Sequence, residues 1–222
     1  MNSAAIAKIL GTGERMSVYD IADSQMATGS TLGAPKIVIV LKATGAIERV
    51  YSPDAGESMI GTIVAHHWDE ARGINLRPLP GTFYIHPDRQ EHVFELTNGV
   101  EVSECIYVLN SQPVGDKIDP PAAYYSITLR NITEQPARVA TYRFAQLKGT
   151  IGPDLDVKYD GHRHAFVVAN RSNKAYVRIF GSLRKPESYE VGHDHGKASA
   201  EGIPGTLSRS TDVTGADPLG TF

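Results

Sequence analysis

The feature that most constrains the fold is a pair of alternating runs within residues 124–147. The first run reads YYSITLR, in which Tyr125, Ile127 and Leu129 alternate with polar residues, and the second, VATYRFAQL, alternates in the same way. Because successive side chains of a strand point to opposite faces, each run predicts a strand with one apolar and one polar face. The residues between the runs include Asn, Thr, Glu, Gln and Pro, which favour a turn. The stretch therefore predicts a long antiparallel hairpin with one face on a core and other hairpins packed around it.

Further hairpins are predicted on both sides of this stretch. In residues 36–51 a β-branched run is followed by a turn at Gly45 and a second apolar run. Asn98-Gly99 is a strong hairpin signal, and a polar turn separates the strand-like runs 165–169 and 175–183. At least ten strand candidates occur, without an amphipathic helix of three turns. We therefore expect an all-β fold, a large antiparallel two-sheet sandwich with few or no long helices.

The sandwich is expected to occupy residues 16–190, after an N-terminal lead over residues 1–15. Residues 149–160 are rich in Gly and Pro and predict a loop. Residues 191–222 contain much Gly, Ser, Thr, Pro and Asp and few large apolar side chains. Such a segment buries too little surface to offset its ordering cost, so a loop or linker tail is predicted there.

Composition excludes several classes of partner. The net charge is −3 and the basic residues are dispersed, so the positive field that nucleic acid requires is absent. Cys105 is the single cysteine, which excludes an internal disulfide and favours an inert buried thiol over a nucleophile. No stretch approaches the roughly 20 apolar residues of a membrane span, and the first residues do not resemble a signal peptide. We expect a cytoplasmic protein without a membrane partner, although a chain cut from a longer precursor would look the same.

Four segments carry a resemblance to a known family: LGAPKIVIVLKATGAIERVYSPDAG, GTIVAHHWDE, GTFYIHPDRQEHVFELTNGVEVSECIYV and YYSITLRNITEQPARVATYRFAQL. Their order, over residues 16–183, resembles the N-terminal β-sandwich of bacterial glucoamylase and glucodextranase glycoside hydrolases, and sugar phosphorylases are similar in layout. The resemblance implies a supersandwich of the galactose-mutarotase-like type that precedes a separate (α/α)6 catalytic barrel.

In that family the catalytic carboxylates lie in the barrel, and no position of this chain matches them. The resemblance therefore implies a non-catalytic domain that is a fragment of a hydrolase acting on α-glucans, with no catalytic residue and no cofactor of its own. Its partners would be carbohydrate and the catalytic barrel. Pairing of two copies through an uncovered face is a further alternative.

One polar segment is the candidate contact with a sugar or with the partner domain. Its residues are His66, His67, Trp68, Asp69, Glu70 and Arg72. An indole ring can stack on a sugar face, while carboxylates and imidazoles can hydrogen-bond hydroxyls. A single tryptophan belongs more often to a core than to a sugar platform. Because the sandwich of the resembled family packs against its barrel, the resemblance implies a third interpretation, in which this segment faces the barrel, and we favour that interface role. A free-standing carbohydrate-binding module is the second hypothesis.

Paired histidines raise a third hypothesis, a metal-dependent β-sandwich enzyme. The four candidate ligands are His193, His195, His162 and His164. Imidazole is a common ligand for zinc and other borderline metals. The spacing is not that of a known zinc motif, so solvent-facing loop histidines are the competing interpretation.

Glycoside hydrolysis by this chain alone would need two carboxylates about 5 to 10 Å apart. The candidates by residue type are Asp69, Glu70, Glu101, Glu104, Asp154 and Asp156. Glu101 and Glu104 are three residues apart on a predicted strand, so they should face opposite sides of the sheet.

Overall fold

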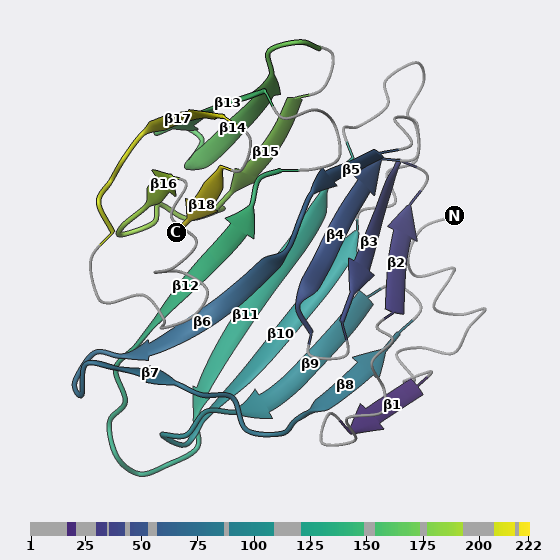
Figure 1. The fold of residues 1–222 in the computed structure, drawn as a ribbon. Helices are drawn as coiled ribbons and strands as arrows, with labels where there is room; N and C mark the ends of the chain where they lie inside the picture. The colour runs from purple at the N-terminus through teal and green to yellow at the C-terminus, as the bar shows by residue number, and fades with distance from the viewer. Residues whose placement is uncertain are drawn as a thin grey trace. The chain divides into compact units, whose positions relative to one another are not determined.

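The computed structural model describes residues 17–20, 30–34, 36–42, 45–52, 57–86, 89–108, 121–148, 154–173, 177–192, 207–215 and 218–222. Every regular element in these ranges is a strand and the pairings are antiparallel, which confirms the all-β sandwich prediction (Figure 1). Within the same ranges no helix has the length and apolarity needed to cross a bilayer. The chain forms two compact units: unit 1 comprises Met1–Gly45 and Pro78–Pro136, and unit 2 comprises Ala46–Arg77 and Ala137–Phe222.

Unit 1 contains a five-stranded sheet in the order β1-β8-β9-β10-β11. Its strands are β1 (Ser17–Asp20), β8 (Thr82–Ile85), β9 (Arg89–Glu95), β10 (Val100–Val108) and β11 (Ala123–Asn131). The predicted Asn98-Gly99 turn joins β9 to β10, and Leu96 N donates to Val100 O at 2.8 Å. Gly99 has a φ of 78°, a conformation that glycine adopts at little cost. The hairpin predicted there is confirmed.

A second hairpin of unit 1 pairs β2 (Ser30–Ala34) with β3 (Ile37–Leu41). Alternate residues of β3 are buried, and β2 packs near β10 of the five-stranded sheet. The core of unit 1 includes Leu32, Ile39, Leu41, Phe83, Phe94, Val102 and Ile106. Unit 1 is thus layered, and the inward face of β9 and β10 is closed off from water.

Unit 2 contains two sheets. In the first, the order β16-β18-β12-β6-β4 is extended by β5 on β4 and by β7 on β6. Its strands are β4 (Ile47–Ser52), β5 (Glu57–Ile60), β6 (Ile63–Asp69), β7 (Ile74–Leu76), β12 (Val139–Gln146), β16 (Glu190–Gly192) and β18 (Leu219–Thr221). The second sheet, in the order β15-β14-β13-β17, consists of β13 (Leu155–Asp160), β14 (Ala165–Asn170), β15 (Val177–Gly181) and β17 (Asp212–Gly215). The buried core of unit 2 includes Ala145, Leu147, Leu155, Val157, Phe166 and Val168.

The hairpin predicted over residues 124–147 is wrong in its pairing, although both of its strands exist. β11 pairs with β10 along its full length, from Val100↔Asn131 to Val108↔Ala123, whereas β12 pairs with β6 and β18. The connector folds on itself, since Asn131 Nδ2 donates to Gln135 O at 2.7 Å. Alternation determines which side chains share a face, but it does not determine the partner strand.

Two segments predicted to lack regular structure contain strands. The loop predicted over 149–160 is wrong for β13, where Leu155 and Val157 alternate with polar residues. The loop or linker predicted over 191–222 is wrong for β17 and β18, which complete the two sheets of unit 2. A Cβ built on Gly220 would lie 2.8 Å from the Phe166 ring, so the lack of a side chain at Gly220 permits β18 to lie this close to Phe166. Residues 1–15 and 193–206 lie outside the described ranges.

Candidate functional site

The predicted sugar or interface segment lies along β6 and the turn that follows it. Strand alternation places His66 and Trp68 on one face of the sheet and His67 and Asp69 on the other. On the second face, His67 is buried and its Nδ1 atom makes a 3.0 Å hydrogen bond with Thr141 Oγ1. The six residues therefore do not converge on one site.

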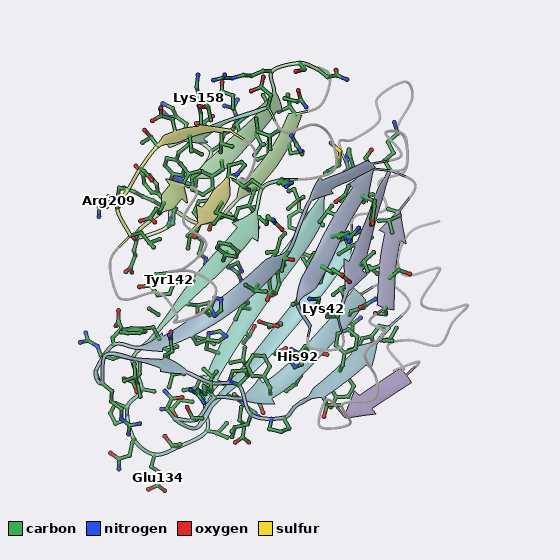
Figure 2. All side chains as sticks on the ribbon, viewed as in Figure 1. Lys42, His92, Glu134, Tyr142, Lys158 and Arg209 are labelled. Carbon is green, nitrogen blue, oxygen red and sulfur yellow. The ribbon has the colours of Figure 1, made fainter. Side chains whose placement is uncertain are left out.

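The face that carries Trp68 contributes to a core cluster of unit 2. In register, Trp68 lies opposite Ala140 and His66 lies opposite Tyr142, which Figure 2 labels on β12. Trp68 is partly buried against the cluster formed by Tyr142, Phe144, Leu207 and Leu219. The Nε2 atom of His66 is buried without a hydrogen-bond partner, and burial lowers the pKa of this imidazole. Trp68 thus packs largely as a core residue, and its role as a sugar contact stays a prediction.

Asp69 closes the turn between β6 and β7. Its Oδ1 atom accepts hydrogen bonds from the backbone N–H groups of Ala71 and Arg72, both at 3.0 Å. Gly73 continues the turn with a φ of 66°. The side chains of Glu70 and Arg72 are exposed. The Asp69 carboxylate therefore has a local structural role of the kind that aspartate commonly has in turns.

The candidate metal ligands are only partly described. His162 and His164 lie in the turn between β13 and β14, where Asp160 Oδ1 accepts a 2.9 Å hydrogen bond from His162 N. Arg163 donates to the same carboxylate, and this hydrogen bond lowers the pKa of Asp160. Within the described ranges no three His, Cys, Asp or Glu side chains gather as metal ligands would. His193 and His195 lie outside those ranges, so the four-histidine site stays a prediction.

Most candidate catalytic carboxylates have structural partners. As predicted, Glu101 and Glu104 lie on opposite faces of β10, since residues along this strand are alternately buried and half-exposed. Glu101 accepts a 2.9 Å hydrogen bond from Arg130 on β11. The ion pairs of two further candidates are Asp154–Arg171 at 3.7 Å and Asp156–Lys158 at 3.6 Å.

A buried polar cluster lies on the inward face of the five-stranded sheet, and sequence reasoning did not find it. Glu104, only 6% exposed, accepts a 2.7 Å hydrogen bond from Tyr125 Oη through Oε1. Its Oε2 atom lies 3.3 Å from His92 Nδ1 (His92 is labelled in Figure 2). The His92 ring contacts Phe94, with ring centroids 4.5 Å apart. Both carboxylate oxygens of Glu104 therefore have partners, and this buried side chain links β10 to β11 through Tyr125 and to β9 through His92.

Gln90, fully buried beside this cluster, ties the sheet to β2. Its side-chain amide donates to Thr31 O at 3.2 Å and accepts a hydrogen bond from Ser30 Oγ. The inward face of unit 1 therefore combines apolar packing with several polar contacts between different strands.

The outward face of the same sheet is polar and aromatic, and we call it the tyrosine face. It includes Tyr84, Arg89, Glu91, Glu101, Ser103, Tyr107, Tyr124, Ser126, Thr128 and Arg130, together with Thr82, Val93, Glu95 and Cys105. Tyr107 and Tyr124 lie opposite each other, and their rings stack with centroids 5.2 Å apart and an interplanar angle of 12°. Ser126, Thr128 and Arg130 are exposed. The face presents aromatic rings next to hydroxyl, carboxylate and guanidinium groups.

An exposed apolar row, which we call the apolar edge, lies on β15. Val177 is 53% exposed and Ile179 is 59% exposed, whereas Arg178 between them points into the core. Leu183, just beyond the strand, is 89% exposed. β15 ends its sheet and pairs with β14 only, as far as the described strands show. Unprotected apolar edge strands are prone to pair with another chain or element.

The chain was compared with known proteins. No protein-family model matches it, and no curated protein matches it either.

Proposed function

We propose that the chain is a non-catalytic β-sandwich domain of a glycoside hydrolase of the glucoamylase and glucodextranase type. In this proposal it acts on α-glucans together with a separate (α/α)6 catalytic barrel, against which it packs. The resemblance over residues 16–183 suggests the family, and the antiparallel architecture agrees with it.

The observation that carries the proposal is the apolar edge. Val177 and Ile179 are each more than half exposed, side by side on an end strand. Burying such side chains against a partner stabilises the complex by roughly 25 cal/mol per Å² of apolar surface. Exposed apolar clusters commonly mark interaction sites, and a neighbouring domain would remove this row from water.

The structural partners of the carboxylates are further support for a non-catalytic role. Asp69 closes a turn, Glu101 pairs with Arg130, and Glu104 is buried in a polar cluster. In the proposal, the acid and base that cleave the glycosidic bond belong to the barrel. The proposal also places the domain in the cytoplasm, in keeping with a single cysteine.

A binding experiment tests the proposal. The purified chain is mixed with the (α/α)6 barrel of a bacterial glucoamylase expressed without its own sandwich, and complex formation is followed by size-exclusion chromatography. We expect co-elution with the barrel, and we expect the double variant Val177→Lys, Ile179→Lys to abolish it.

The matched control carries lysines at two other exposed apolar positions, Ile74 and Ile132. This control should bind the barrel as the unsubstituted chain does. Failure of the unsubstituted chain to bind, or equal binding by the double variant, would contradict the proposed docking.

A further inference from the structure

We propose that the tyrosine face binds a glucan chain directly, with Tyr107 and Tyr124 stacking on sugar rings. Sugar binding here would give the domain a substrate-capturing role that packing against a barrel does not require. The choice of α-glucan as the glycan rests on the proposed function, whereas the position of the site rests on the face itself.

Two tyrosines form the aromatic centre of the face. Tyr107 and Tyr124 are half-buried, so each ring is supported by its surroundings and still reaches solvent. Their mutual stacking fixes the orientation of both rings before any ligand arrives. Ligands bind more tightly to preorganised groups because less side-chain freedom is lost on binding.

Hydrogen-bonding groups continue the face along the neighbouring rows. Along one row of the sheet, Ser126 lies next to Cys105 and then Glu91, and along the following row Thr128 lies next to Ser103. Residues two apart on a strand are separated by roughly 6.6 Å, so successive rows lie at regular intervals. Glu91 is held in place by a 3.0 Å hydrogen bond from Ser103 Oγ. Hydroxyl and carboxylate groups in such rows can accept and donate bonds to sugar hydroxyls.

The chemistry of the face favours a glycan over other occupants. The face carries the cations Arg89 and Arg130 and the anions Glu91, Glu95 and Glu101, so the excess positive charge that nucleic acid requires is missing. The centre of a protein interface is usually depleted of charged residues, whereas this face carries charges across several strands. An uncharged ligand with many hydroxyl groups and flat apolar ring faces matches both the rings and the polar groups.

Calorimetric titration of the full chain with maltooligosaccharides tests the inference. We expect saturable binding by the unsubstituted chain and a loss of about tenfold in affinity for Tyr124→Ala, because the variant lacks a ring-stacking contact; tenfold corresponds to about 1.4 kcal/mol. Tyr189→Ala serves as the matched control, since Tyr189 belongs to unit 2, where it stacks on Tyr159, and is not a member of the face. The affinity of this variant for the sugar should not change.

A second variant, Ser126→Arg, tests the site even if Tyr124→Ala fails to fold. Ser126 is exposed beside the rings, so Ser126→Arg should obstruct the sugar while leaving both tyrosines in place, and it should also weaken binding about tenfold. Thermal unfolding of each variant would establish that the fold is retained.

The outcomes separate the site from the proposed function. Binding that survives both substitutions would overturn the site but keep a role with α-glucans. Binding of cello-oligosaccharides alone, lost in Tyr124→Ala, would support the site and contradict the α-glucan assignment. If titration with maltooligosaccharides and with cello-oligosaccharides gives no heat of binding, the inference is overturned. The barrel-docking experiment would still decide the proposed function.

Discussion

The two units bury charged side chains in different ways. In unit 1, Glu104 lies inside the sandwich with a hydrogen bond from Tyr125 and with His92 alongside. In unit 2, Arg178 is 5% exposed and donates through Nη1 to Met59 O at 2.9 Å. Its Nε and Nη2 atoms are buried without a partner, and burial lowers the pKa of this guanidinium.

The difference shows that burial of a charge does not by itself indicate stabilisation. Taking a charge out of water is costly, and only complete hydrogen bonding offsets that cost. Glu104 has partners for both oxygens, so removing it would leave those partners unsatisfied. Arg178 makes one hydrogen bond, from Nη1 to Met59 O, and has two buried donors without a partner, so removing it loses one bond but relieves the penalty of the two unpaired donors. Substitutions at the two positions should therefore change stability in opposite directions.

The largest expected effect is that of Glu104→Leu. We expect the free energy of unfolding to fall by about 3–5 kcal/mol, because Tyr125 Oη and His92 Nδ1 lose a buried partner. Urea denaturation measures this loss. The control Glu101→Leu removes a carboxylate from the outward face, where its pair with Arg130 is exposed, and should cost about 1 kcal/mol or less. Equal losses for both variants would contradict a structural role for the buried cluster.

Gly45→Ala should have the next largest effect. Gly45 has a φ of 80°, and an added Cβ would lie 2.4 Å from His92 Nδ1. We expect a loss of about 2–3 kcal/mol from backbone strain and displacement of the His92 ring. Gly73→Ala is the matched control, because Gly73 has a φ of 66° and open space around the added Cβ. This control should lose only the backbone contribution, about 1 kcal/mol. A similar loss in the two variants would show that contact with His92 is unimportant.

Arg178→Met should have a smaller effect of the opposite sign. The methionine fills much of the same volume without unsatisfied donors, so we expect a gain of about 1 kcal/mol in the free energy of unfolding. Arg178→Lys, which keeps the charge, should not give this gain. A loss for Arg178→Met as large as that for Glu104→Leu would remove the contrast between the units.

The smallest effect concerns the pH dependence of stability through His66. Burial lowers the pKa of His66 in the folded protein, so the unfolded chain binds more protons between the folded pKa and about 6.5. His66 therefore has no destabilising effect above about pH 6.5, and stability should fall as pH decreases below that value. His66→Phe should make the unfolding midpoint less dependent on pH between about pH 7 and 5 than in the unsubstituted chain. An unchanged pH profile would contradict this role.

The sequence predicted which side chains share a face of a strand, but it did not predict which strands pair. Alternation placed Glu101 and Glu104 on opposite sides of β10, and Asn98-Gly99 identified the β9–β10 turn. The cluster around Glu104 could not be predicted, because it requires the register of three strands to bring His92 and Tyr125 to the same carboxylate. Such alignments depend on contacts between segments far apart in sequence, which a local pattern does not contain.

The candidate site shows the same limit. The β6 segment was identified for its chemistry, but its alternation divides His66 and Trp68 from His67 and Asp69. The tyrosine face was missed because its members come from separate strands, and no short motif brings Tyr107 next to Tyr124. A paired register, once known, shows such faces directly.

The order of the units along the chain has a consequence for synthesis on the ribosome. β6 pairs with β12, so Ile63–Asp69 emerges long before its partner Val139–Gln146. Between the two, the chain supplies β8 to β11, which complete the five-stranded sheet of unit 1. In a nascent chain, β6 therefore lacks its β12 partner while the strands of unit 1 are completed, and an unpaired strand of this kind is prone to aggregation until its partner emerges.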